Sequence, residues 1–172
     1  MKLARVGVIA AAVLAVATLA WAQKTDFSGT WALDAEASGA PAGGAPAGGA
    51  PGGGGGGGGR GGGRGGGLGQ GGMVKQTATD LTVERQMGEN KVTATYKLDG
   101  TESKNSMMGR GGAPVEAVSV AKWEGPALVI VTKTDMGNGP QESTQKWTLA
   151  GTALTIETTN ARGTQKMVYK KQ

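Results

Sequence analysis

The stretch Asp26-Phe27-Ser28-Gly29-Thr30-Trp31-Ala32-Leu33-Asp34 carries the most information about the fold of this 172-residue chain. Residues 28–34 are the first of several short segments that the sequence predicts to be β-strands. Two regions of very different composition flank this stretch, one resembling an export signal and the other rich in glycine. The fold therefore has to be built from residues 23–38 and from the chain beyond the glycine-rich region.

The region before the first strand is typical of an export signal. Lys2 and Arg5 precede an apolar run over residues 6–20, and Ala20 and Ala22 supply the small residues of a cleavage site. This run is shorter than the roughly 20 residues of a membrane-spanning helix. We expect residues 1–22 to be a signal peptide, with an uncleaved anchor as the alternative. The mature chain is then expected to lack a membrane span and to be periplasmic or secreted in a bacterium.

The absence of two residue types limits the chemistry. The chain has no cysteine and no histidine, which excludes thiol nucleophiles, disulfides, thiolate metal sites, imidazole bases and histidine ligands. The carboxylates show no spacing that singles out a catalytic pair, and no serine–lysine arrangement stands out. We therefore expect a protein that is not an enzyme and that has no cofactor and no metal site.

Charge gives no indication of nucleic-acid binding. The formal net charge is +5, and removal of the signal peptide lowers it to +3, with 16 basic and 13 acidic residues. The basic residues are scattered among acidic ones and do not form a cluster. Arg60 and Arg64 resemble the arginine–glycine segments of RNA-binding proteins, but they have no aromatic partner nearby. We expect no nucleic-acid partner.

The glycine-rich region covers residues 39–72. It contains 22 glycines in 34 residues and an unbroken glycine run over residues 52–59. Glycine loses the most backbone freedom on ordering and has no side chain to bury. We expect residues 39–72 to be a disordered insertion between the first strand, in residues 23–38, and the remaining strands, in residues 73–172.

The rest of the chain alternates between β-forming segments and short turns. Turn sequences such as Asp99-Gly100 and Glu124-Gly125-Pro126 suit antiparallel hairpins. We expect an all-β fold, an antiparallel up-and-down meander of nine or ten strands that closes into a lipocalin-like barrel. The expected strands are residues 28–34, 81–87, 91–98, 102–107, 115–123, 127–134, 142–149, 153–159 and 164–171.

Alternation within the strands predicts the composition of the interior. Leu128 and Ile130 share a face with Thr132, and in the next strand Trp147 shares a face with Gln145. If this face is the interior, one end of the barrel is apolar and the other is lined by hydroxyl and amide groups. Such a layer holds water or the polar head of a ligand. The alternative is a bulge that reverses the alternation and turns the polar groups toward solvent.

Three motifs resemble the calycin superfamily, which contains the lipocalins and the fatty-acid-binding proteins. They are Phe27-Ser28-Gly29-Thr30-Trp31, Lys122-Trp123-Glu124-Gly125 and Val168-Tyr169-Lys170-Lys171. More narrowly, the mature chain resembles exported bacterial lipocalin-like proteins. The resemblance implies that Gly29 and Trp31 are structural residues that close one end of the barrel.

The same resemblance bears on ligand capture. The last strand of fatty-acid-binding proteins carries an Arg-x-Tyr anchor for a carboxylate. Here Tyr169 matches the tyrosine and Met167 replaces the arginine, so carboxylate capture of that kind is not implied. Lipocalins also pack a late arginine over the first-strand tryptophan, and Arg162 is the candidate for that role.

Six side chains are candidates for contact with a ligand, although the aromatic ones are better explained as core residues. We expect an exported, non-enzymatic, lipocalin-like protein that binds or carries a small apolar or amphipathic ligand. The alternative is a filled structural barrel that acts by protein–protein interaction in the cell envelope. The candidate ligand-binding residues are Tyr96, Trp123, Thr132, Gln145, Trp147 and Tyr169.

Overall fold

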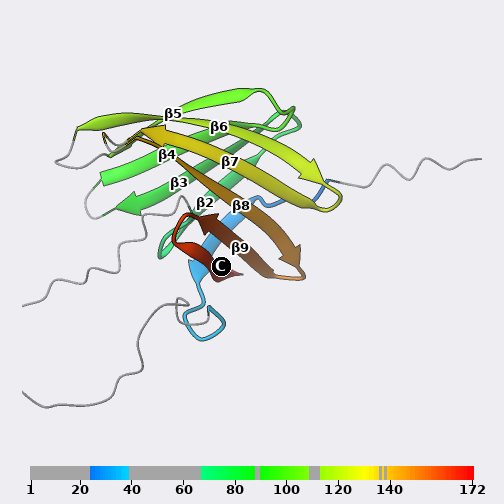
Figure 1. Ribbon diagram of the computed structural model, residues 1–172. Coiled ribbons are helices and arrows are strands. Elements are labelled where there is room, and N and C mark those ends of the chain that lie inside the picture. Colours follow the sequence, from blue (N-terminus) through cyan, green and yellow to red (C-terminus); the bar gives the residue numbers. More distant parts are fainter. Residues whose placement is uncertain (1–23, 39–66, 88–89, 109–112, 136, 138) are drawn as a thin grey trace, which may run out of the picture.

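A computed structural model describes residues 24–38, 67–87, 90–108, 113–135, 137 and 139–172 (Figure 1). The predicted signal peptide and most of the predicted insertion lie outside these residues. Within the described residues the chain forms ten strands and no helix. None of these described residues forms a helix that is long and apolar enough to cross a membrane.

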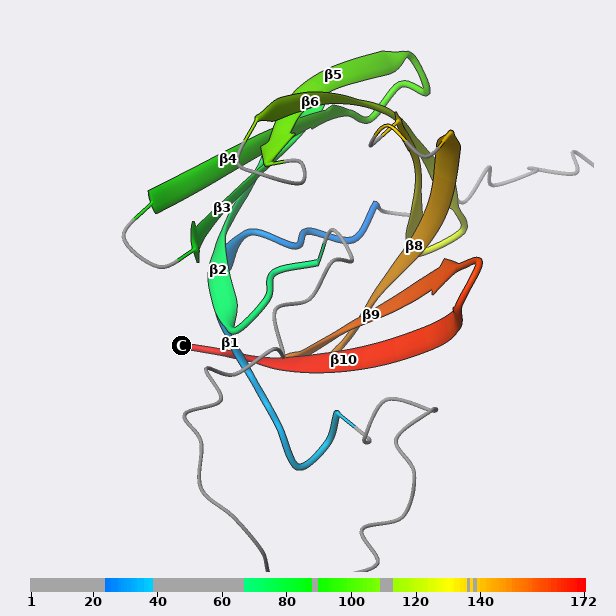
Figure 2. The same ribbon diagram turned by 60° about the vertical axis from the view of Figure 1, so that its left-hand side comes forward.

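All ten strands belong to one antiparallel sheet, in the order β4-β3-β2-β1-β10-β9-β8-β7-β6-β5. Neighbours in sequence are therefore neighbours in space, as an up-and-down meander requires, and Figure 2 shows the sheet curving into a ring. This confirms the predicted fold class. The strands are β1 (Gly29–Leu33), β2 (Gly71–Gln76), β3 (Asp80–Met87), β4 (Asn90–Lys97), β5 (Glu102–Met108), β6 (Pro114–Glu124), β7 (Ala127–Asp135), β8 (Pro140–Ala150), β9 (Ala153–Asn160) and β10 (Gly163–Lys171).

The structure differs from the expected end of the insertion. β2 begins at Gly71, and Leu68 is buried in the core, so residues 67–72 belong to the barrel and not to the insertion. A β-carbon at Gly72 would lie 2.5 Å from the Glu84 carbonyl oxygen, and one at Gly71 would collide with the Trp31 backbone. The last glycines of the run are therefore strand residues that let β2 pass close to β1 and β3.

The barrel is nearly closed, and side chains complete it at one seam. β4 and β5 are the two ends of the sheet. Asn105 on β5 accepts a hydrogen bond from the Thr95 amide at 2.8 Å and donates one to the Thr95 carbonyl at 3.0 Å. Ser103 accepts from the Lys97 amide at 2.8 Å. These side chains satisfy backbone groups of β4 that a neighbouring strand would otherwise pair.

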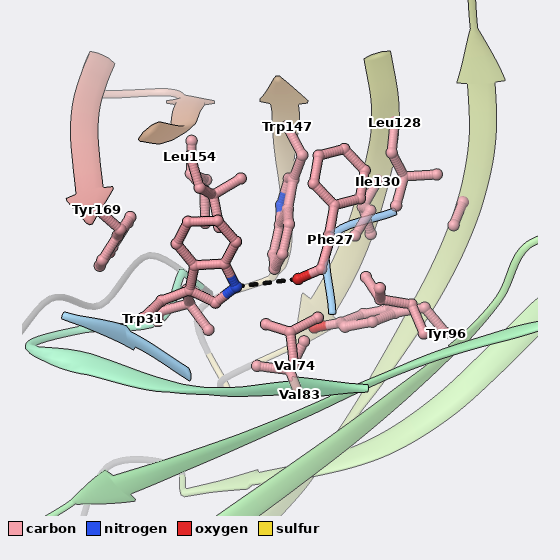
Figure 3. Packing of buried hydrophobic residues seen from close by; sticks show 14 of the residues in the cluster. Phe27, Trp31, Val74, Val83, Tyr96, Leu128, Ile130, Trp147, Leu154 and Tyr169 are labelled. Atoms are coloured by element: carbon pink, nitrogen blue, oxygen red, sulfur yellow. Dashed lines mark hydrogen bonds between the residues drawn. The ribbon is translucent and has the colours of Figure 1, made fainter. Parts of the chain in front are cut away.

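One end of the barrel is filled by apolar side chains. Phe27 stacks on Trp123, with ring centroids 5.9 Å apart, and meets Trp147 edge-on. The Trp31 indole nitrogen donates to the Phe27 carbonyl oxygen at 2.9 Å (Figure 3). The segment before β1 therefore packs inside the ring and closes this end. We call this cluster the apolar floor; its members are Phe27, Trp31, Leu128, Ile130, Trp147, Leu154 and Ile156.

Candidate ligand-binding interior

The polar face of β7 and β8 points into the barrel. Ile130 is paired with Gln145 in an uninterrupted register, so no bulge reverses the alternation, and Gln145 is 1% exposed. Ser119 and Thr132 share a 2.9 Å hydrogen bond on the same inner face, and Thr158 is paired with Gln145 from β9. The predicted layer of buried hydroxyl and amide groups is therefore present. We call Ser119, Thr132, Gln145 and Thr158 the polar layer.

The polar layer connects to the apolar floor through one hydrogen bond. Gln145 accepts from the indole nitrogen of Trp147 at 3.0 Å, two residues along β8. This bond gives the buried indole N–H a partner and fixes the orientation of the amide. An amide held in one orientation suits recognition of a polar head better than a freely rotating one.

The two ends of the interior differ in access to solvent. The side chains of the apolar floor are at most 2% exposed. Among the inward-facing side chains outside the floor, several are only partly buried. These partly buried residues are Val92, Ala94, Asn105, Met107, Val115, Thr134 and Met167.

Sequence reasoning missed a charged group on the inner wall. Arg85 follows Leu81 and Val83 at alternate positions of β3, and both of those residues are buried. Its Nη1 donates to the carbonyl oxygen of Gly67 at 2.6 Å. The alternation Leu81-x-Val83-x-Arg85 was the signal that could have placed this arginine inside the barrel.

Tyr169 and Tyr96 lie within the electrostatic reach of Arg85. Burial raises the pKa of Tyr169 to about 12, and the charge of Arg85 opposes that shift. Burial likewise raises the pKa of Tyr96, again opposed by Arg85. Both hydroxyls are therefore neutral donors at physiological pH. The Tyr169 hydroxyl lies 3.2 Å from the Gly69 carbonyl oxygen and 3.1 Å from the sulfur of Met167, the residue that replaces the anchor arginine.

The structure places the six predicted ligand contacts in three groups. Thr132 and Gln145 belong to the polar layer. Trp123 and Trp147 pack on Phe27, so both contribute to closing the barrel. Tyr96 and Tyr169 belong to the inner wall near Arg85. Contact of any of them with a ligand stays a prediction.

Gly29 and Trp31 belong to β1 and lie beside the C-terminal end of β10. Gly29 has a positive φ of 147°, and a β-carbon there would lie 2.6 Å from the side chain of Lys171. The cation over Trp31 is Lys171, whose Nζ lies 5.7 Å from the ring centroid. The expectation that Arg162 takes this place is wrong, because Arg162 follows β9 in an exposed turn at the other end.

The described residues contain no cluster of three or more aspartate or glutamate side chains that could hold a metal ion. Several carboxylates are instead paired with lysines on the outer surface. Glu84 forms ion pairs with Lys75 and Lys91 at 3.2 and 2.6 Å. Hydrogen bonds from these lysines, that from Lys91 first, lower the pKa of Glu84. The geometry of these groups is that of surface ion pairs.

Comparison with known proteins gives fold likeness only. No protein-family model and no curated protein sequence matches the chain. Solved structures that match include secretory abundant heat soluble protein 4 from Ramazzottius varieornatus, with 25% sequence identity over 58% of this chain and 67% of that chain and a TM-score of 0.45. The fatty acid transporter REP1-NXSQ has 11% identity, coverage of 59% and 69%, and a TM-score of 0.47. A mutant of the fluorescent protein UnaG has 21% identity, coverage of 59% and 70%, and a TM-score of 0.47.

Because the three TM-scores lie below 0.5, none of them assigns a ligand or a family to this chain.

Proposed function

We propose that the chain is a calycin-type barrel that binds a small amphipathic molecule in its interior and catalyses no reaction. The polar layer inside the barrel supports this proposal most directly. Its hydroxyl and amide groups face the interior, where they bond to one another and to Trp147 and offer further donor and acceptor sites to a polar head. A ligand with an apolar body against the floor and a polar head at the layer satisfies both surfaces.

The competing function is a filled barrel that acts through its outer surface. The close packing of Phe27, Trp31 and Trp147 favours it at the closed end, where these residues are at most 2% exposed. The partly buried inner wall at the opposite end favours the binding function.

Export is part of the proposal: residues 1–22 would be removed, and the mature chain would begin at Gln23 in the periplasm or outside the cell. The intact mass of the protein recovered there tests that cleavage.

Titration with dodecanol, followed by tryptophan fluorescence, tests the binding function. Trp31, Trp123 and Trp147 all face the interior, so we expect the spectrum to change on binding. We expect Thr132→Val to weaken binding about threefold to tenfold, because it removes a hydroxyl from the polar layer while keeping its shape. Thr144→Val, on the outer face of β8, is the matched control and is expected to bind as the wild type does.

Native mass spectrometry of the same samples gives the deciding readout. Interior binding is supported if the wild type forms an adduct with dodecanol and the Thr132→Val protein forms less of it. No adduct and no spectral change across a panel of amphiphiles would contradict it and favour the filled barrel.

A further inference from the structure

The residues immediately before β2 enter the barrel. Figure 2 shows residues 67–70 running across the inside of the ring. Leu68 is 1% exposed and belongs to the same core cluster as Trp31 and Tyr169. Gly67 is also buried. This short piece of chain therefore occupies interior space on the side that carries Arg85.

Two polar groups of the inner wall hold this piece of chain through its backbone. Arg85 donates to the Gly67 carbonyl oxygen at 2.6 Å, and the Tyr169 hydroxyl is 3.2 Å from the Gly69 carbonyl oxygen. Leu68 lies between the two carbonyl groups. Residues 67–69 thus present hydrogen-bond acceptors to the wall and an apolar side chain to the core, which is how an amphipathic ligand would be bound.

The carbonyl oxygen is a weak partner for Arg85. Among the described residues, no aspartate or glutamate forms an ion pair with this arginine, although its side chain is partly buried. A carboxylate stabilises a partly buried guanidinium more than a carbonyl oxygen does, because it adds the attraction of opposite charges and can accept two parallel hydrogen bonds. An anionic head would therefore compete well for this position.

The sequence makes residues 67–69 easy to withdraw. Between residues 52 and 69, every residue other than Leu68 is glycine or arginine. Glycine has no side chain to pack, so release of this piece of chain gives up the burial of one large apolar side chain and the hydrogen bonds to the carbonyl groups of residues 67, 68 and 69.

The geometry points to residues 67–69 as an internal competitor of the ligand. An amphiphile with an anionic head binds Arg85 and Tyr169 in place of the two carbonyl groups, and its apolar part takes the space of Leu68. This inference rests on the proposed binding function. It adds that the ligand is negatively charged. It also adds a regulatory step, because the apparent affinity for the ligand then depends on the fraction of molecules in which residues 67–69 have left the interior.

Titrations of the mature full chain with dodecanoate and dodecanol test the inference, since the two probes differ in head charge. Leu68→Ala makes residues 67–69 easier to displace, and we expect it to bind dodecanoate about tenfold more tightly than the wild type. Arg85→Gln keeps hydrogen-bond donors but removes the charge. We expect it to bind dodecanoate about tenfold more weakly and dodecanol no more weakly. Arg162→Gln, in an exposed turn, controls for overall charge and is expected to match the wild type.

Hydrogen exchange of the unmodified protein gives a second test that does not depend on how the variants fold. Dodecanoate is expected to accelerate exchange in peptides that cover residues 67–70. Slower exchange there would overturn the inference. A folded Leu68→Ala protein with unchanged affinity for dodecanoate would also overturn it. So would an Arg85→Gln protein whose affinities for dodecanoate and dodecanol fall equally. If dodecanol binds and responds to Thr132→Val while these results fail, the inference is wrong and the proposed function stands. If no probe binds any protein, both fail.

Discussion

At the scale of single residues, burial controls the chemistry of the inner wall. Tyr169 is fully buried, and removal of its hydroxyl from water raises its pKa from 10.0 to about 12. The neutral phenol is therefore favoured in the folded state and can donate to a carbonyl oxygen or to the head of a ligand. Because the raised pKa belongs to the folded state, this hydroxyl stabilises the fold fully below pH 10 and loses that contribution as the pH rises toward 12.

The first prediction concerns this pH dependence. We expect the difference in unfolding free energy between the wild type and Tyr169→Phe to be constant below pH 10 and to fall between pH 10 and 12. Denaturant unfolding at several pH values measures it, and the comparison cancels the titration of lysines common to both proteins. A difference that stays constant through this window would contradict the account. The account would also be contradicted if the phenolate absorbance of both tyrosines rose with a midpoint at pH 10.

Some of the inner-wall residues could be predicted from the sequence, and one could not. Gln145 and Thr132 could be placed inside because their strands also carry Leu128, Ile130 and Trp147, whose apolar side chains indicate the buried face. Arg85 was missed because a charged side chain is ordinarily assigned to solvent. Its partner, the Gly67 carbonyl, belongs to the glycine-rich region, where the sequence pattern carries no directional information.

At the scale of elements, the seam between β4 and β5 distinguishes this barrel from a fully hydrogen-bonded one. Ser103 and Asn105 supply three hydrogen bonds to the β4 backbone. A side-chain amide offers both a donor and an acceptor, so Asn105 can satisfy both backbone groups of Thr95. The seam is therefore held by two side chains, whereas the other strand pairs are held by backbone ladders.

The second prediction concerns this seam. We expect Asn105→Ala to lower the unfolding free energy by about 1 to 2 kcal/mol, because two hydrogen bonds are lost and the Thr95 amide and carbonyl groups lose their partners. Urea unfolding measures the loss, and hydrogen exchange at the Thr95 amide is expected to accelerate. Ser106→Ala, on the outer face of the same strand, is the control. Equal stability of Asn105→Ala and Ser106→Ala would show that the seam contributes nothing.

The strands themselves were largely predictable from sequence. Turn pairs such as Asp99-Gly100 mark the ends of hairpins, and alternation assigns the faces between them. β2 was not predicted because its first two residues, Gly71 and Gly72, continue the composition of the glycine-rich region. Only the close approach of the neighbouring backbones, visible in three dimensions, explains why glycine is required there.

At the scale of the whole molecule, the barrel combines a tightly packed apolar floor with inward-facing polar groups outside it. The floor contributes seven of the twelve largest fully buried side chains, while the polar layer and Arg85 place hydrogen-bonding groups on the inner face. This asymmetry predicts an amphipathic ligand oriented with its apolar part toward the floor.

Nuclear Overhauser effects between dodecanol and the isotope-labelled protein test this central claim most directly. The account predicts contacts from the alkyl chain to Ile130 and from the head to Thr132 and Gln145, all on the inner face of β7 and β8. Contacts confined to outward side chains such as Val131 and Thr144 would contradict it and place the binding surface outside the barrel.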